Sequence, residues 1–205
     1  MERLTIQVGG FEVNCSILSE SGKAWIVDPG QEAGRIIDLL AKKGLEPAAV
    51  LLTHAHFDHI SGIPGLLAKF PELPVYVHEQ DAQMFGHPLN QLPPEYPSFA
   101  RPKNLVVFRS TCDLQPSTLD FEVIETPGHT PGGVCYYFPK DKLLLSGDTL
   151  FAGSVGRTDL PGGDMATLMD SLQKLVALPD DTLVIPGHGM HTTIAAEKRG
   201  NMFLQ

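Results

Sequence analysis

The chain has 205 residues, of which 42% are hydrophobic, and this suits a single globular domain spanning residues 1–205. Its formal net charge of −9 argues against nucleic acid or an anionic membrane as a partner, because both require a basic face. The start MERLTIQVGG lacks the features of a signal peptide, and no apolar run approaches the roughly 18 residues of a membrane span. We therefore expect a cytoplasmic protein.

The three cysteines, Cys15, Cys112 and Cys135, are widely spaced and form no CxxC pair. An odd number without a paired motif indicates reduced thiols and not a disulfide framework. Cys15 and Cys135 stand in the apolar contexts VNCSIL and GGVCYYF, which are typical of buried small side chains. We assign no chemistry to any cysteine.

Strands and helices alternate along the first half of the chain. Short apolar runs bounded by turn residues predict strands, whereas apolar residues spaced three and four apart predict helices. The predicted strands are LTIQV (4–8), VNCSIL (13–18), AWIVD (24–28), AAVLLT (48–53) and VYV (75–77). The predicted helices are 32–44, 63–70 and a short one at 78–85.

The second half repeats this alternation. Its predicted strands are FEVIE (121–125), GGVCYYF (132–138), KLLLSG (142–147) and TLVIP (182–186), and its predicted helices are 164–178 and a last one near 192–200. Two β-rich halves, each with helices, predict a mixed α/β (α+β) fold. We expect two sheets packed face to face and covered outside by helices, which is an αββα sandwich.

The segment 86–102 (GHPLNQLPPEYPSFARP) is rich in proline and therefore predicts a long loop, not a helix or a central strand. A loop of this length is either a surface connection or a functional lid. Tyr96, Phe99 and Arg101 would give such a lid an apolar wall and one cation.

The stretch THAHFDH (53–59) holds four candidate metal ligands: His54, His56, Asp58 and His59. In an extended chain, residues two apart point the same way, so His54 and His56 can reach one spot. Asp58 and His59 begin the next turn and can reach a neighbouring spot. The pattern differs from HExxH, whose histidines lie one helical turn apart. The alternative is a solvated or hydrogen-bonded histidine cluster, although crowded imidazoles repel one another once protonated.

Further donors are expected downstream, because four ligands from one loop cannot complete two metal sites. Three boxes share one pattern, an apolar strand followed by glycine and then a donor. These boxes supply His129 in TPGHTPGG, Asp148 in SGDTLF and His188 in IPGHG. Glycine lets the backbone pass close to a crowded centre. Each box alone is a weak signal, but together with THAHFDH they predict a metal centre.

Together these boxes resemble the metal-binding motifs of the metallo-β-lactamase superfamily, and their order covers nearly the whole chain. The resemblance implies the αββα sandwich, with the metals at one edge between the sheets. It implies a first metal held by three histidines: His54, His56 and His129. The second metal takes Asp58, His59 and His188, and Asp148 bridges the two.

The segments 153–164 (GSVGRTDLPGGD) and 192–203 (TTIAAEKRGNMF) most resemble small proteins related to glyoxalase II, the hydroxyacylglutathione hydrolases. This resemblance implies hydrolysis of S-lactoylglutathione or a related small acyl thioester. Full-length glyoxalase II is expected to carry a helical C-terminal extension that helps to grip glutathione. Because this chain stops at Gln205, we expect no separate C-terminal helical domain. β-Lactam hydrolysis is not expected, since Asp148 stands where many lactamases place cysteine.

A persulfide dioxygenase, an oxidoreductase with the same fold, is the alternative. It uses a single iron held by residues that match His54, His129 and Asp148, and it also has a GRTD segment. The presence of both His59 and His188 beside the first site favours the hydrolase. A noncatalytic metal-binding protein is a third hypothesis, less favoured because no ligand of the pair is missing.

Two divalent metal ions are the expected cofactors, zinc first, with iron or manganese as alternatives. The two carboxylates among the ligands do not neutralise two divalent ions, so the pair stays cationic enough to hold a bridging hydroxide at neutral pH. Metal binding lowers the pKa of water from 15.7 to about 7. This hydroxide is expected to attack the thioester carbonyl while the metals stabilise the oxyanion. Asp58 is the expected catalytic residue, which orients the hydroxide and accepts its proton.

Three residues are expected to support the site. Asp28, in WIVDPG at a strand end, is expected to hydrogen-bond to the ligand loop; the alternative is a simple turn aspartate. Arg157 and Asp159 are expected to form an ion pair that shapes the floor of the site.

His78, His87 and His191 match no box and are expected at the surface or in packing. We assign no substrate-binding residue, and the nearest candidate cations by sequence are Lys140, Lys142, Lys198 and Arg199.

Overall fold

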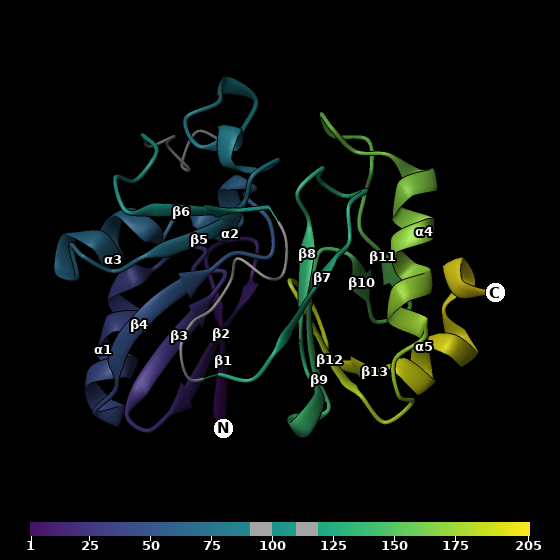
Figure 1. The fold of residues 1–205 in the computed structure, drawn as a ribbon, viewed down its shortest axis with the longest axis horizontal. Helices are drawn as coiled ribbons and strands as arrows, with labels where there is room; N and C mark the ends of the chain where they lie inside the picture. The colour runs from purple at the N-terminus through teal and green to yellow at the C-terminus, as the bar shows by residue number, and fades with distance from the viewer. Residues whose placement is uncertain (91–99, 110–118) are drawn as a thin grey trace. The chain divides into compact units, whose positions relative to one another are not determined.

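The computed structural model describes residues 1–90, 100–109 and 119–205 of the chain. The chain divides into two compact units, unit 1 (Met1–Leu119) and unit 2 (Asp120–Gln205). Each unit combines one main β-sheet with helices (Figure 1). The single domain 1–205 stays a prediction.

Unit 1 contains a six-stranded sheet in the order β1-β2-β3-β4-β5-β6. Its strands are β1 (Glu2–Val8), β2 (Val13–Glu20), β3 (Lys23–Val27), β4 (Glu46–Leu51), β5 (Val75–His78) and β6 (Leu105–Phe108). The first three strands pair antiparallel, whereas β3 to β6 pair parallel. The carboxyl ends of parallel strands meet at one edge of a sheet, where α/β proteins place their ligands. The loop after β4 begins at this edge.

Two helices cover one face of this sheet (Figure 1): α1 (Ala33–Lys43) and α3 (Ile63–Lys69). Ile36 and Leu66 of these helices are buried in one core cluster with Ile26 and Val50 of the strands. The one-turn helix α2 (Phe57–Ile60) and the 3-10 turns η1 (Ala82–Met84) and η2 (Pro88–Asn90) complete the described elements of the unit. The helices and the sheet therefore share one apolar core beneath the loops at the sheet edge.

Unit 2 contains a five-stranded sheet in the order β13-β12-β9-β8-β7 and a small hairpin. Its strands are β7 (Glu122–Glu125), β8 (Val134–Phe138), β9 (Leu143–Gly147), β12 (Leu183–Pro186) and β13 (Thr192–Thr193), and the hairpin pairs β10 (Leu150–Phe151) with β11 (Ser154–Val155). Within the sheet only β9 and β12 pair parallel.

The helices α4 (Met165–Val176) and α5 (Ile194–Gly200) lie on one side of the sheet of unit 2 (Figure 1). Leu168 and Leu172 of α4 pack in one cluster with Leu144 of β9 and Val184 of β12. Two 3-10 turns, η4 (Pro139–Asp141) and η5 (Met202–Leu204), complete the unit. Each unit thus has its own apolar core.

Most predicted elements are present, but the helix predicted over 78–85 is wrong. His78 ends β5, because this strand pairs in parallel with β6 as far as His78 and Phe108. Only Ala82–Met84 forms a 3-10 turn. The strand β6, although its residues LVVF form a short apolar run, and the hairpin β10–β11 were not predicted. Of the proline-rich stretch 86–102, residues 91–99 lie outside the described residues, and the predicted lid residues Tyr96 and Phe99 are among them.

Cys15 and Cys135 are buried and form no disulfide, whereas Cys112 lies outside the described residues. Burial raises the pKa of the Cys15 thiol far above its ordinary value, so this thiol stays protonated. The Cys135 thiol donates a hydrogen bond to the carbonyl of Ser146. Both side chains therefore act in packing. In the part of the chain that the structure describes, no helix has the length and apolar character needed to cross a membrane.

Candidate metal centre

The loop that follows β4 carries the first group of predicted ligands. His54 and His56 precede α2, whose single turn carries Asp58 and His59. The rings of His54 and His56 meet edge to face with centroids 4.9 Å apart, and the centroids of His54 and His59 are 4.1 Å apart. All three histidines are buried. Imidazoles this close repel one another when protonated, so the group suits neutral ligands around a cation.

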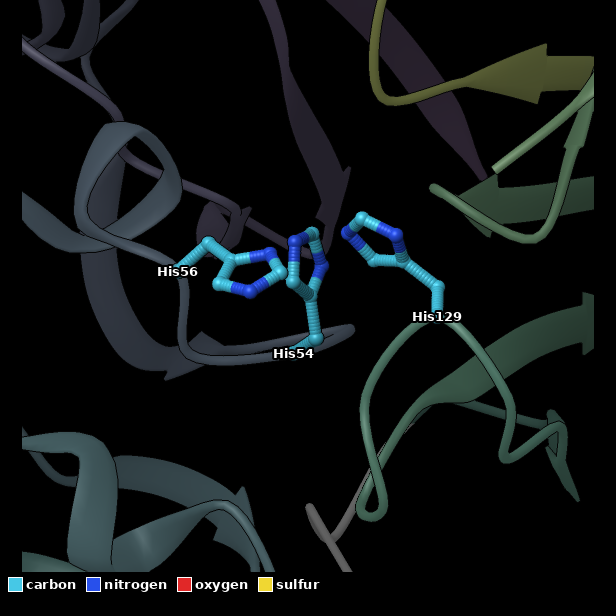
Figure 2. Close-up of side chains that lie close together, drawn as sticks. All are labelled: His54, His56 and His129. Atoms are coloured by element: carbon cyan, nitrogen blue, oxygen red, sulfur yellow. The ribbon is translucent and has the colours of Figure 1, made fainter. Parts of the chain in front are cut away.

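Figure 2 shows the side chains of His54 and His56 on the loop after β4, and that of His129 on the loop after β7. His56 is the extended residue that immediately precedes α2, with φ −64° and ψ 149°. This change from extended to helical backbone directs successive ligands differently. One donor atom of His54 and one of His56 lie within 4.8 Å of each other, and Asp58 lies in the turn that follows.

Asp28 anchors the start of the ligand loop. This carboxylate, 2% exposed, accepts hydrogen bonds from the Thr53 amide at 2.8 Å and the Thr53 hydroxyl at 2.6 Å. The hydroxyl donates to Asp28, so it must accept the proton of His54 Nδ1, which lies 3.1 Å away. His54 therefore keeps its Nε2 lone pair for a ligand. Asp28 Oδ2 also lies 3.1 Å from Nδ1 of His59.

Glycine allows the ligand loop to lie close to the segment after β3. A Cβ on Gly30 would lie 2.4 Å from the carbonyl oxygen of Asp58, and one on Gly62 would lie 2.7 Å from the carbonyl oxygen of Pro29. The amide of Gly62 donates to that same Pro29 oxygen. The DPG motif (28–30) therefore packs closely against the backbone of the segment that carries Asp58 and His59.

Two buried residues that the sequence did not single out also hold the ligand loop. Asp81, fully buried, accepts a hydrogen bond from the amide of Ala55 at 3.0 Å. Asn90 accepts one from the amide of Phe57 at 2.9 Å and donates to the carbonyl of Ala55 at 2.8 Å. No local pattern marks these residues, since Asp81 stands in a stretch predicted as helix and Asn90 in one predicted as loop.

Unit 2 brings its own predicted ligands together. Asp148, in the turn after β9, has Oδ2 at 3.6 Å from Nε2 of His129 and at 3.6 Å from Nε2 of His188. His129 is buried, whereas the side chain of His188 is 26% exposed. An aspartate between two imidazole nitrogens fits the predicted shared ligand.

The backbone of Arg157 sets the tautomer of His129. Its carbonyl oxygen lies 2.7 Å from His129 Nδ1 and can only accept, so Nδ1 carries the proton and Nε2 keeps its lone pair. Next to it, a Cβ on Gly156 would lie 1.9 Å from the Asp148 carbonyl oxygen. The GRTD segment thus touches the ligands through its backbone.

Arg157 and Asp159 form the ion pair that the sequence predicted. Two hydrogen bonds of 2.7 Å join the guanidinium to the carboxylate. The hydrogen bond from Arg157 lowers the pKa of Asp159 to about 2. Both side chains are more than half exposed, so the pair is solvated. Its role as a floor of the site stays a prediction.

The other predicted candidates are engaged elsewhere. His78 is buried and packs edge to face on Phe108, with ring centroids 5.5 Å apart, as expected for a packing histidine. Three of the candidate cations pair with surface aspartates: Lys140 with Asp120, Lys142 with Asp181 and Lys198 with Asp180. The ammonium groups of these lysines therefore already have carboxylate partners in the protein.

The donor set fits divalent metal ions. Imidazole nitrogens and carboxylate oxygens, without thiolates, are ligands that zinc, iron and manganese accept. In unit 1 alone, one donor atom from each of Asp28, His54 and His59 lies within 4.8 Å of the others. Since Asp28 already binds Thr53, we assign it to support of the loop and keep the histidines as ligands.

Comparison with known proteins places these features in a family. The model of the metallo-beta-lactamase superfamily matches residues 8–188. The probable metallo-hydrolase YqgX of Bacillus subtilis is 38% identical over 96% of this chain and 94% of its own length. The hydroxyacylglutathione hydrolase GloC of Haemophilus influenzae is 38% identical over 97% of this chain and 96% of its own.

Three solved structures are similar over nearly the whole chain. BLEG-1, described as a B3 metallo-beta-lactamase, has a TM-score of 0.90 at 38% identity and covers 99% of both chains. TTHA1623 in a di-iron-bound form has a TM-score of 0.85 at 38% identity, covering 98% of this chain and 100% of its own. ETHE1 from Myxococcus xanthus has a TM-score of 0.80 at 28% identity, covering 98% and 84%.

These similarities confirm the α/β class and the metallo-β-lactamase fold expected from the sequence. The family model spans all seven predicted ligands, from His54 to His188. The structure gathers these ligands on loops at the ends of strands in each unit. The chain belongs to the metallo-β-lactamase superfamily.

Proposed function

We propose that this protein is a binuclear metal-dependent hydrolase of small acyl thioesters. The observation that carries the proposal is the state of the ligands. His54 and His129 are each held, by Thr53 and by the Arg157 carbonyl, in the tautomer that leaves Nε2 as a donor. A merely solvated histidine cluster does not require such support.

The proposed ligand assignment follows the family resemblance. One ion takes three histidines, His54, His56 and His129. The other takes Asp58, His59 and His188, and Asp148 binds both. Zinc is the first expectation, and the di-iron form of TTHA1623 supports iron as a real alternative. Metal analysis of the purified protein should give about two equivalents in total.

When bound, such a pair of ions lowers the pKa of water and polarises a carbonyl oxygen. Asp58 is the residue that we propose for the proton transfer. Its side chain is 12% exposed and therefore reachable, and its Oδ2 lies 3.8 Å from His59 Nε2. A carboxylate in this position can orient an attacking water and accept its proton. Asp58→Asn is expected to lower kcat more than it raises KM.

The similarity to GloC supports S-lactoylglutathione as one substrate. Because three candidate lysines pair with aspartates, we expect a weak grip on the carboxylates of glutathione. Hydrolysis should be measurable but inefficient, with a KM near or above 1 mM, the upper end of the usual range. Steady-state kinetics on a panel of acyl thioesters checks this. No thioester cleavage at any metal loading would overturn the proposal.

Two other activities have specific support and belong in the same panel. The similarity to BLEG-1 favours a test of β-lactam hydrolysis, although Asp148 stands where many lactamases have cysteine. A persulfide dioxygenase remains the alternative for an iron-loaded protein. Oxygen uptake with glutathione persulfide under ferrous loading, without thioester cleavage, would reverse the assignment. The cytoplasmic location and the absence of nucleic-acid and membrane partners remain predictions.

A further inference from the structure

We propose that Asn90 and Asp81 are positioning residues that set the affinity of one of the two metal sites, the one that uses His54 and His56, separately from the other. This inference rests on the binuclear centre proposed above. It assigns a role to two buried polar side chains that belong to none of the metal-binding boxes.

The first step of the argument is which peptide groups the two side chains hold. Asp81 binds the Ala55 amide, which belongs to the peptide between His54 and Ala55. Asn90 binds the Ala55 carbonyl and the Phe57 amide, which belong to the peptides on either side of His56. Three successive peptide groups, from His54 to Phe57, are therefore fixed by side chains.

The second step is that this part of the loop lacks regular secondary structure. Residues 54–56 lie after the end of β4 and before the start of α2. Their peptide groups are buried with the loop, where an unsatisfied amide or carbonyl is costly. Side chains from outside the loop therefore replace the hydrogen bonds that a strand or helix would provide, and they define the direction of His56.

The third step concerns where the polar groups of Asp81 and Asn90 are directed. Asp81 stands at the position before η1, yet its side chain makes no capping hydrogen bond to that turn. Its carboxylate is directed to Ala55 instead. Asn90 is 8% exposed, and its amide nitrogen also donates to the carbonyl of Met84 at 3.1 Å. This third bond ties the loop to the η1 turn.

The fourth step separates the two sites. Asp28 lies beside Nδ1 of His59, a ligand of the second proposed site, and through Thr53 it also supports His54 of the first. Asn90 and Asp81 instead contact the backbone around His56. Asn90 also binds the amide of Phe57, the first residue of α2, but the contact between His59 and Asp28 does not involve it. Loss of Asn90 should therefore displace His56 more than His59.

Stepwise zinc binding, measured by competition with a chromophoric chelator, tests the inference. His56→Ala and His188→Ala identify which binding step belongs to which site. Asn90→Ala and Asp81→Ala should each weaken the step lost in His56→Ala by about 10- to 100-fold, the usual effect of removing a partner of a metal ligand. The other step should be weakened much less.

Two further variants separate positioning from packing. Asn90→Asp has nearly the same size and keeps an acceptor for Phe57, but it cannot donate to Ala55, so it should weaken the same step. Asn104→Ala removes a hydrogen bond to the Leu73 carbonyl elsewhere in unit 1. It should lower the thermal stability and leave both binding steps unchanged.

The possible outcomes are distinct. Equal weakening of both steps, or a loss of thermal stability without a change in either step, would overturn the positioning role and leave the metal centre intact. A wild-type protein that binds no metal would overturn the proposed function and this inference together. Selective weakening in Asn90→Asp, with both steps normal in Asn104→Ala, supports it.

Discussion

At the scale of single residues, Asp28 shows how one side chain supports several ligands. Its backbone has φ 50°, an uncommon conformation for a residue with a Cβ. Strained residues of this kind persist where the surrounding structure determines them strongly, and they gather at functional sites. Here the carboxylate binds Thr53, which in turn sets the tautomer of His54. A turn aspartate without these contacts would have no reason to be buried.

The proposal that Asp148 binds both metal ions leads to a prediction for single-residue variants. Asp148→Ala should lose both ions, because its carboxylate is the ligand common to the two sites. His188→Ala should mainly empty one site, since it belongs to one ligand set. Elemental analysis after gel filtration measures both. Equal losses from the two variants would contradict the division of ligands.

At the scale of elements, close contacts between loops and helices hold the ligands of unit 2. Gly128, directly before His129, has φ 134°, and a Cβ there would lie 2.4 Å from backbone atoms of Leu168 in α4. The Gly128 carbonyl also accepts the amide of Asp164. The PGH box is therefore packed against the start of α4, and its glycine is required by this approach.

Gly128→Ala should destabilise the protein by about 1–3 kcal/mol, as overpacking of a close contact does, and should weaken metal binding. Gly34→Ala is the matched control, because Gly34 lies in α1 with nothing within 4 Å of the added Cβ. That change should stabilise the protein by roughly 0.5–1 kcal/mol. Denaturant unfolding measures both. Similar effects of the two substitutions would refute the role given to Gly128.

The start of α4 also predicts a pH dependence. Asp164 caps this helix by accepting a hydrogen bond from the Thr167 amide at 2.7 Å. Hydrogen bonds from Thr167 lower the pKa of Asp164 below its ordinary value of 3.8. The stabilisation by a carboxylate of lowered pKa is complete above the ordinary value and is lost as the pH falls below it.

Asp164→Asn keeps a capping oxygen but does not ionise, so it isolates this effect. The wild type should be more stable than the variant at neutral pH, because an anion suits a helix N-terminus. The difference should shrink as the pH falls below about 4. Unfolding curves at several pH values provide the measurement. A difference that stays constant down to pH 3 would contradict the assignment.

At the scale of the whole molecule, the proposed metals should contribute to the stability of the chain. A ligand that binds only the folded state stabilises it by about 2.7 kcal/mol at 100 times its Kd. Chelation should therefore lower the Tm, and zinc should restore it. Calorimetry with and without chelator measures the shift. An unchanged Tm, together with full removal of metal, would show that the ligand loops are stable without ions.

The formal net charge of −9 is also a property of the whole molecule, and it bears on which partners the protein can bind. Three surface lysines, Lys140, Lys142 and Lys198, form ion pairs with aspartates. A small-molecule substrate, with no nucleic-acid partner, stays a prediction from this charge.

The sequence by itself was sufficient for the fold class, for most strands and helices, and for the family. The reason is physical: the apolar runs, the helical spacing and the boxes at strand ends are local patterns that each element needs in order to form. The boxes also indicated seven candidate ligands, because donors after a strand lie at the edge of a sheet.

Only the tertiary structure decided what holds these candidates in place. Asp81 and Asn90 are 26 and 35 residues from Ala55, which they bind, and Gly128 meets Leu168 through the packing of α4. The parallel register of β5 with β6, which pairs Val75 with Leu105, likewise joins distant residues. Contacts between residues so far apart leave no local periodicity in a single sequence. They exist only once the chain has folded and buried the polar groups that must be satisfied.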